Sequence, residues 1–144
     1  MFFFKLTVDF CSTIWDKGGK LNERKQMKIT VIHKAMRDET PTAVALVHIP
    51  TNPKSGIIDI EDALEYAYRW TNNIGGSWSK KIGPDANDNV EVLAPLHWSE
   101  KRQMHLGLRS TMTFDEMIVH MENELSPWNG KTFKVDSFGF KEII

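Results

Sequence analysis

The sequence predicts an α+β fold in which a small antiparallel sheet packs against one main helix and the chain closes with a C-terminal β-hairpin. Three observations carry this prediction: strand-like patterns at residues 28–33 and 43–49, a helical pattern at about residues 60–71, and a strand-turn-strand pattern near the C-terminus. The chain has 144 residues, 41% hydrophobic and 26% charged, as in an average globular domain with one core.

A polar segment divides the chain into a leader, residues 1–26, and a single globular α+β domain, residues 27–144. An apolar pattern begins directly after Met27, whereas the residues before it are polar and lack periodicity. Residues 23–25 can be encoded by a purine-rich stretch that resembles a ribosome-binding site, so we hypothesise that translation starts at Met27. The alternative is that residues 2–8 form an edge strand, because their strand propensity is high.

The first half of the domain reads as two strands and a helix. Residues 28–33 alternate and are rich in β-branched side chains, and residues 43–49 form a short apolar run. Residues 50–56 are dense in Pro, Asn and Gly, so the second strand ends there. Asp59 is a favourable N-cap for a helix at residues 60–71, whose apolar side chains recur with helical spacing.

The middle of the chain predicts mostly irregular structure. Residues 72–89 carry two Gly-containing dipeptides with several Asn and Asp residues, which indicates a long loop, and long loops are often functional. Residues 90–93 are a short strand candidate. The polar stretch at residues 99–107 gives no clear pattern.

The C-terminal third favours two antiparallel strands. Residues 116–121 and 132–135 have strand patterns, and Asn129-Gly130 between them is typical of a type I′ hairpin turn. The alternative is a helix over residues 113–124, opened by a capping box.

Composition disfavours several classes of function. A formal net charge of −1 gives no broad positive field for nucleic acid. Cys11 is the only cysteine and the five histidines lack metal-ligand spacing, so we expect no disulfide and no metal site. Lys5 and Asp9 interrupt the apolar start, so we expect no export signal or membrane anchor. No nucleophile elbow or phosphate loop occurs, so we expect no catalytic residues and no cofactor. We expect the protein to act in a bacterial cytoplasm.

A set of aromatic, Arg and hydroxyl side chains forms the candidate site for a ligand or partner. Trp and Arg often anchor binding because they combine a large area with directional polar groups. The competing interpretation is that the tryptophans pack in the core and that the hydroxyls cap the next element. The candidates are Arg69, Trp70, Asn73, Trp78, Arg109, Ser110 and Thr111.

Two segments resemble small accessory proteins of phages and mobile elements. The first covers residues 63–74 with Ser77-Trp78-Ser79, and the second covers residues 109–143. In that family an Arg-Ser-Thr-Ser-Val-Gly-Asp stretch leads into a strand, a turn with Gly, a second strand and a Gly-Phe closing segment. Arg109-Ser110-Thr111 and Asp115 match the family stretch.

The match is closer at the C-terminus and departs from the family in one place. Residues 130–143 keep the turn glycine, the strand and the Gly-Phe closure, which favours the hairpin over the helix. Met112-Thr113-Phe114 stands where the family has Ser-Val-Gly, and a residue other than glycine resists the left-handed backbone of a tight turn. The resemblance covers about half of the chain.

The resemblance and the absence of a catalytic motif together predict a non-enzymatic phage or mobile-element protein. It would act by stoichiometric binding, either to counter a host defence protein or to sequester a nucleotide-like signal, and homo-oligomers are compatible with this role. One alternative is an enzyme acting on nucleotides or nucleic acid through His97, His105 and Asp115. The other alternative is DNA or RNA binding by a basic face. That face would comprise Lys80, Lys81, Lys101, Arg102 and Arg109.

Overall fold

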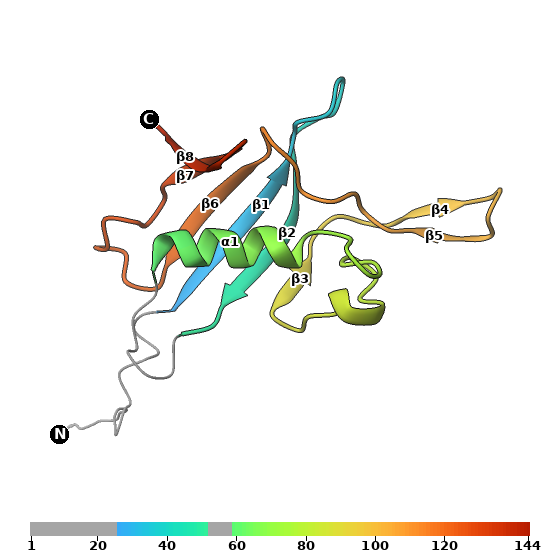
Figure 1. Cartoon of the computed structure of the whole chain (residues 1–144), viewed down its shortest axis with the longest axis horizontal. Coiled ribbons are helices and arrows are strands. Elements are labelled where there is room, and N and C mark those ends of the chain that lie inside the picture. The colour runs from blue at the N-terminus through green and yellow to red at the C-terminus, as the bar shows by residue number, and fades with distance from the viewer. Residues whose placement is uncertain (1–25, 52–58) are drawn as a thin grey trace, which may run out of the picture.

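A six-stranded antiparallel sheet forms the body of the protein, with one helix across one face (Figure 1). The computed structural model describes residues 26–51 and 59–144. The strand order is β3-β2-β1-β6-β7-β8, and β4 and β5 make a separate two-stranded sheet. The strands are β1 (Met27–His33), β2 (Thr42–Ile49), β3 (Val90–Val92), β4 (His97–Ser99), β5 (Met104–Leu106), β6 (Glu116–Met121), β7 (Thr132–Asp136) and β8 (Gly139–Ile143). The predicted α+β class and the presence of a C-terminal hairpin are confirmed; the hairpin consists of β7 and β8, whereas the predicted strands correspond to β6 and β7.

The helix α1 (Ile60–Trp70) begins and ends close to the predicted bounds. The Asp59 side chain accepts a hydrogen bond from the Glu61 N–H at 2.8 Å, which satisfies one of the free donors of the first turn. Acidic residues in the first turn and Arg69 in the last turn suit the helix dipole. The helix ends at Trp70, one residue before the predicted end, and Thr71 is the C-cap.

The core lies between α1 and the sheet face that it covers. Alternation along β1 places Ile29 and Val31 on that face, where both are fully buried. Ile29 pairs with Val47 on β2 and with Val119 on β6, so three neighbouring strands contribute one row of β-branched side chains. Leu64 of α1, also fully buried, packs in the same cluster.

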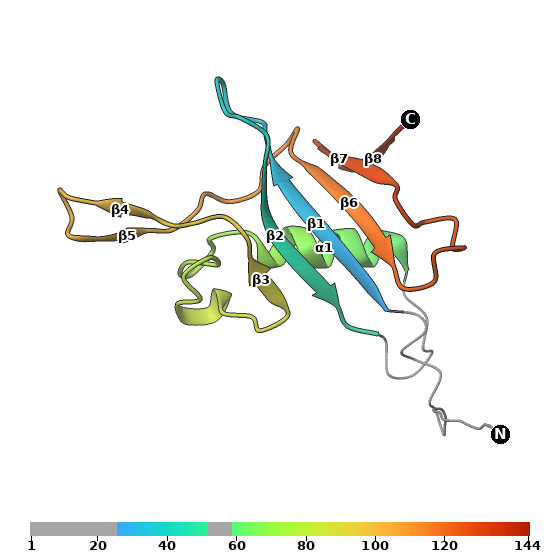
Figure 2. The ribbon, with the colours of Figure 1, turned by 180° about the vertical axis from the view of Figure 1, so that it is seen from behind.

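The opposite face of the sheet is not covered by a helix in the described part of the chain (Figure 2). Its side chains are mostly polar or half-buried, as is common for antiparallel sheets with one face in water. Thr30 and His120 hydrogen-bond across β1 and β6 at 2.9 Å, and Lys34 pairs with Glu116 at 2.9 Å.

The predicted strands on either side of Asn129-Gly130 are confirmed, but the turn between them differs. β6 and β7 pair antiparallel through a connection at residues 122–131, longer than a two-residue hairpin. Gly130 has φ 84°, whereas Asn129 is not in the left-handed region, so this is not a type I′ turn. The alternative helix at residues 113–124 is wrong, because residues 116–121 extend to pair with both β1 and β7.

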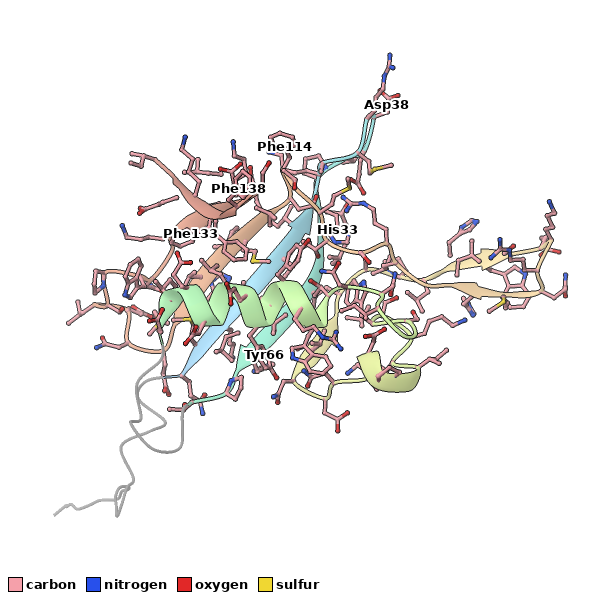
Figure 3. All side chains as sticks on the ribbon, in the orientation of Figure 1. His33, Asp38, Tyr66, Phe114, Phe133 and Phe138 are labelled. Atoms are coloured by element: carbon pink, nitrogen blue, oxygen red, sulfur yellow. The ribbon has the colours of Figure 1, made fainter. Side chains whose placement is uncertain are left out.

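The turn before β6 forms although its residues depart from the family pattern. Phe114 takes φ 82°, a conformation that glycine would adopt without strain. The Asp115 N–H donates to the Met112 carbonyl at 3.0 Å, and the Phe114 N–H donates to the Val135 carbonyl at 2.8 Å. Figure 3 shows the Phe114 ring at the same end of the molecule as Phe138. The hydrogen bonds therefore hold a bulky residue in the backbone shape expected of glycine.

Other predictions fall on loops or outside the described residues. The first two strands match their predicted bounds to within one residue. The predicted loop at 72–89 is irregular apart from a short 3-10 helix, η2 (Gly83–Asp85). The predicted leader, residues 1–26, lies outside the described residues apart from Gln26. No helix in the described part of the chain has both the length and the apolar character needed to cross a bilayer.

Candidate functional site

A buried polar cluster lies where the end of β1, the C-terminus of α1 and the segment before β6 meet. We call it the His33–Asp115 network. His33 is the last residue of β1, and Figure 3 shows its side chain beside the end of α1. Four members of the network, including both residues that name it, are no more than 2% exposed. The network comprises His33, Glu39, Thr71, Arg109, Thr111 and Asp115.

Asp115 accepts hydrogen bonds from three backbone N–H groups and from one guanidinium. The donors are the amides of Lys34 (2.8 Å), Ala35 (2.9 Å) and Met112 (2.8 Å), together with two nitrogens of Arg109 (2.8 and 2.9 Å). Burial raises the pKa of Asp115, but these hydrogen bonds outweigh burial and hold the pKa below its usual value. Both carboxylate oxygens are therefore occupied within the protein.

Arg109 joins two carboxylates. Besides Asp115, its guanidinium donates to the two oxygens of Glu39, at 2.6 and 3.2 Å. The hydrogen bonds to Asp115 contribute most to raising the pKa of Arg109 above its usual value. The hydrogen bond from Arg109 likewise lowers the pKa of Glu39. This bidentate geometry fixes the β1–β2 connection, where Glu39 lies, against the segment that precedes β6.

A relay of hydrogen bonds connects His33 to the end of the helix. The Thr71 hydroxyl donates to the Ala67 carbonyl at 2.7 Å, so it has no proton left for Thr111, whose oxygen lies 2.8 Å away. The Thr111 hydroxyl therefore donates to Thr71 and accepts from His33 Nε2, at 3.0 Å. This order assigns the proton of neutral His33 to Nε2.

Neutral His33 makes stability depend on pH. Burial, followed by the positive charge of Arg109, lowers the pKa of His33 from 6.5 to about 4. Between these values the unfolded chain binds a proton that the folded protein does not bind, so stability falls as the pH is lowered from 6.5 toward 4. We expect a loss of about 2–3 kcal/mol attributable to His33 across this window.

The control for this pH dependence is His33→Gln, which cannot titrate. The free energy of unfolding is measured by urea denaturation at several pH values. Plotted against pH, it is expected to change less steeply in the variant than in the wild type. Parallel slopes would mean that His33 does not stay neutral in the folded state.

The loop after α1 holds the segment 107–111 through side-chain hydrogen bonds. Trp78 is 1% exposed, and its indole N–H donates to the Arg109 carbonyl at 2.9 Å. The Asn73 amide side chain accepts from the Trp78 N–H and donates to the Leu108 carbonyl, at 2.9 and 3.0 Å. Ser79 Oγ accepts from the Leu108 N–H at 2.7 Å. These contacts fix the base of the β4–β5 hairpin.

The same loop is folded around a second buried carboxylate. Asp85 Oδ2 accepts from the N–H groups of Ile74, Gly75 and Gly76, at 2.7 to 2.9 Å. Burial raises the pKa of Asp85, yet the three amides outweigh burial and lower it overall. Arg69 Nη1 lies 3.1 Å from Asp85 Oδ1 without hydrogen-bond geometry, so the contact is an ion pair.

The β4–β5 hairpin projects from the body as an arm, residues 94–108 (Figure 1). Trp98 and Met104 are each 42% exposed on it. The rings of Trp98 and His105 pack edge to face across the two strands, with their centroids 5.1 Å apart. The Trp98 indole N–H donates to the Glu100 carboxylate at 2.9 Å. The arm therefore presents an aromatic ring in a fixed orientation to solvent.

The structure brings most of the predicted binding residues together, but through internal bonds. Asn73 and Ser110 hydrogen-bond to each other, because the Asn73 N–H donates to Ser110 Oγ at 2.8 Å. Trp78, Arg109 and Thr111 lie in the contacts described above. The remaining two candidates, Arg69 and Trp70, lie beside the Asp85 loop. The Arg69 guanidinium carbon lies 4.1 Å from the centroid of the Trp70 ring.

The residues of the two alternative functions lie in different parts of the molecule. Asp115 is buried in the network, whereas His97 and His105 are exposed on the arm. Register pairs His97 with Leu106 and His105 with Trp98, so the two histidines point to opposite faces of the hairpin. In the part of the chain that the structure describes, no group of His, Cys, Asp or Glu side chains could hold a metal ion.

The five basic residues of the proposed nucleic-acid face do not gather as one set. Arg109 is held by two carboxylates, and Lys81 donates to the Val90 carbonyl at 2.6 Å. Lys80 and Arg102 do line one hollow, beside the arm.

Sequence reasoning missed His33, Glu39 and Trp98 as members of a candidate site. Glu39 and His33 are distant in sequence from Arg109 and Thr111, so no local motif connects them. Trp98 lies just before the polar segment at residues 99–107, whose structure the sequence did not define.

A comparison of the chain with protein-family models, curated proteins and solved structures found no match.

Proposed function

We propose that this protein is a non-enzymatic binding protein that engages a partner stoichiometrically through the β4–β5 arm. The observation that carries the proposal is the arm itself, which projects from the body (Figure 1). The arm exposes Trp98 and Met104 to solvent. Exposed aromatic and methionine side chains are enriched where proteins bind one another.

The buried polar groups support a scaffold role for the rest of the molecule. Asp115, Arg109 and His33 each use their donors or acceptors on other groups of the same chain. Buried groups whose hydrogen bonds are satisfied internally rigidify a fold. The network and the loop after α1 would then hold the arm in one orientation, which lowers the entropic cost of binding.

The target that we propose is a host protein in a bacterial cell. This follows from the resemblance of the C-terminal segment, residues 109–143, to accessory proteins of phages and mobile elements. Binding would mask the target, for example a defence protein, without any chemical step. A nucleotide-like ligand is the second candidate that the same resemblance allows.

A site-specific photo-cross-linking residue tests the proposal in cells. Placed at Lys101, in the turn of the arm, the cross-linker is expected to give one discrete adduct. At Lys141, on the edge strand β8, it is expected to give none. The Trp98→Ala change, which removes the exposed ring, is expected to reduce the Lys101 adduct at least about tenfold. An adduct that Trp98→Ala leaves unchanged, or no adduct at the arm, would contradict arm-mediated binding.

A further inference from the structure

A groove runs between the arm and the loop that follows α1. It encloses about 290 Å³, and its walls come from Ser77, Lys80 and Ile82 on the loop side. On the arm side the lining includes Arg102, Met104 and Leu106. The hollow beside the exposed part of the arm is therefore lined by both apolar and cationic residues.

The lining of the groove is positively charged. Lys80 and Arg102 contribute two cations, and no Asp or Glu lines the hollow. Neither Lys80 nor Arg102 takes part in an ion pair among the described residues. Lys80 Nζ donates one hydrogen bond, to the His105 carbonyl at 2.9 Å, and an ammonium group has three protons to donate.

A backbone edge also faces the groove. In the described part of the chain β5 pairs with β4 on one side only. The His105 carbonyl points to Lys80 and so away from β4, and the N–H of the same residue in an extended strand points the same way. The His105 N–H therefore offers a donor to an extended segment lying along the groove.

Two glycines in the lining of the groove allow close packing at its walls. A Cβ at Gly107 would lie 2.5 Å from Ser77 Oγ, and one at Gly76 would lie 2.0 Å from the Ile82 carbonyl oxygen. A side chain at Gly107 would push the base of the arm away from the loop, and a side chain at Gly76 would clash within the loop itself. The groove is thus a fixed feature of the loop and the base of the arm.

We propose that this groove binds an acidic, extended segment of a partner protein, an inference that rests on the proposed binding function. Carboxylates of the segment would pair with Lys80 and Arg102, its main-chain carbonyl would accept from the His105 N–H, and its apolar side chains would contact Ile82 and Met104. The groove is open along its length, unlike the enclosed pockets that bury most of a small ligand.

Charge favours a polypeptide over a nucleic acid as the occupant. The whole chain has a formal net charge of −1 and a sequence pI near 6.5, which gives no long-range attraction for a polyanion. Two cationic side chains in one hollow can pair with a few carboxylates, whereas nucleic-acid grooves follow many phosphates with a continuous basic track.

Fluorescence anisotropy of the purified full-length protein with a labelled synthetic peptide tests the proposal. The probe is a peptide of about eight alternating Glu and Val residues, which spans about 26 Å when extended. The Arg102→Gln change is expected to weaken binding about tenfold, because a charge-assisted hydrogen bond is lost. The matched control is Lys101→Gln, which removes the same charge from the arm at a residue that does not line the groove; its effect is expected to stay below about twofold.

Two further probes complete the test. A peptide with Gln in place of Glu is expected to bind at least about tenfold more weakly, and added salt is expected to weaken binding of the acidic peptide. Equal losses for Arg102→Gln and Lys101→Gln would overturn the proposal, as would no binding of the acidic peptide. Tighter binding of a labelled oligothymidylate would also overturn it and would assign the groove to nucleic acid.

The outcomes separate this inference from the proposed function. If Lys101 cross-links to a partner in a Trp98-dependent manner but the acidic peptide does not bind, the arm binds a partner and only the groove assignment fails. If the peptide binds as expected but no adduct forms at the arm in cells, the groove assignment stands and the proposed role of the arm fails.

Discussion

Replacing Asp115 by alanine is expected to destabilise the folded protein by about 3–4 kcal/mol. The change removes the acceptor of three backbone N–H groups and leaves the buried side of Arg109 with Glu39 as its only anionic partner among the described residues. Removing one partner of a buried ion pair costs more free energy than the pair contributes. The remaining donors then have no hydrogen-bond acceptor, because burial also keeps them from water. The free energy of unfolding, measured by urea denaturation and circular dichroism, reports the loss.

The matched control for this change is Asp88→Ala. Asp88 is exposed, and the same loss of one carboxylate is expected to change stability by less than about 0.5 kcal/mol. If both variants unfold at the same urea concentration as the wild type, Asp115 does not organise the network.

Replacing Trp78 by alanine is expected to cost about 3–5 kcal/mol. The indole is 1% exposed and packs in the core cluster, with its centroid 6.3 Å from that of the His33 ring. Its removal therefore leaves a large cavity and an Arg109 carbonyl without its hydrogen-bond donor. The Trp78→Phe variant keeps much of the volume and is expected to lose less, mainly the hydrogen bond. Urea denaturation of both variants separates the two effects.

Trp98→Ala is the control for Trp78, because it removes the same side chain from a position that is 42% exposed. Its stability is expected to stay within about 0.5 kcal/mol of the wild type. If Trp98→Ala destabilises the protein as much as Trp78→Ala, the arm packs against the body and does not project as a free surface.

Local patterns predicted the elements whose residues bury one face. Alternating β-branched residues gave β1 (Met27–His33), and an N-cap with helical spacing gave α1 (Ile60–Trp70). The type of the turn at Asn129-Gly130 could not be predicted, because the Asn129 side chain accepts from the Met121 N–H and stabilises a longer connection. Tertiary contacts thus overrode a strong dipeptide preference.

The arm and the network escaped prediction for different reasons. β4 (His97–Ser99) and β5 (Met104–Leu106) are too short for a period-two pattern to emerge, and their side chains do not face a core. The partners of Asp115 come from Lys34 and Ala35, about eighty positions away in sequence, and such contacts leave no local signal. Arg109-Ser110-Thr111 was nevertheless selected, because its residue types suit dense hydrogen bonding.

The separation of the arm from the core has a consequence for how the protein diversifies. β4 and β5 contact each other far more than they contact any strand of the main sheet. On the proposal that the arm binds a partner, substitutions at these exposed positions would change what is bound at little thermodynamic cost to the scaffold. On that proposal, the surface that the arm presents can change by substitution while Gly107 keeps the base of the arm close to the loop.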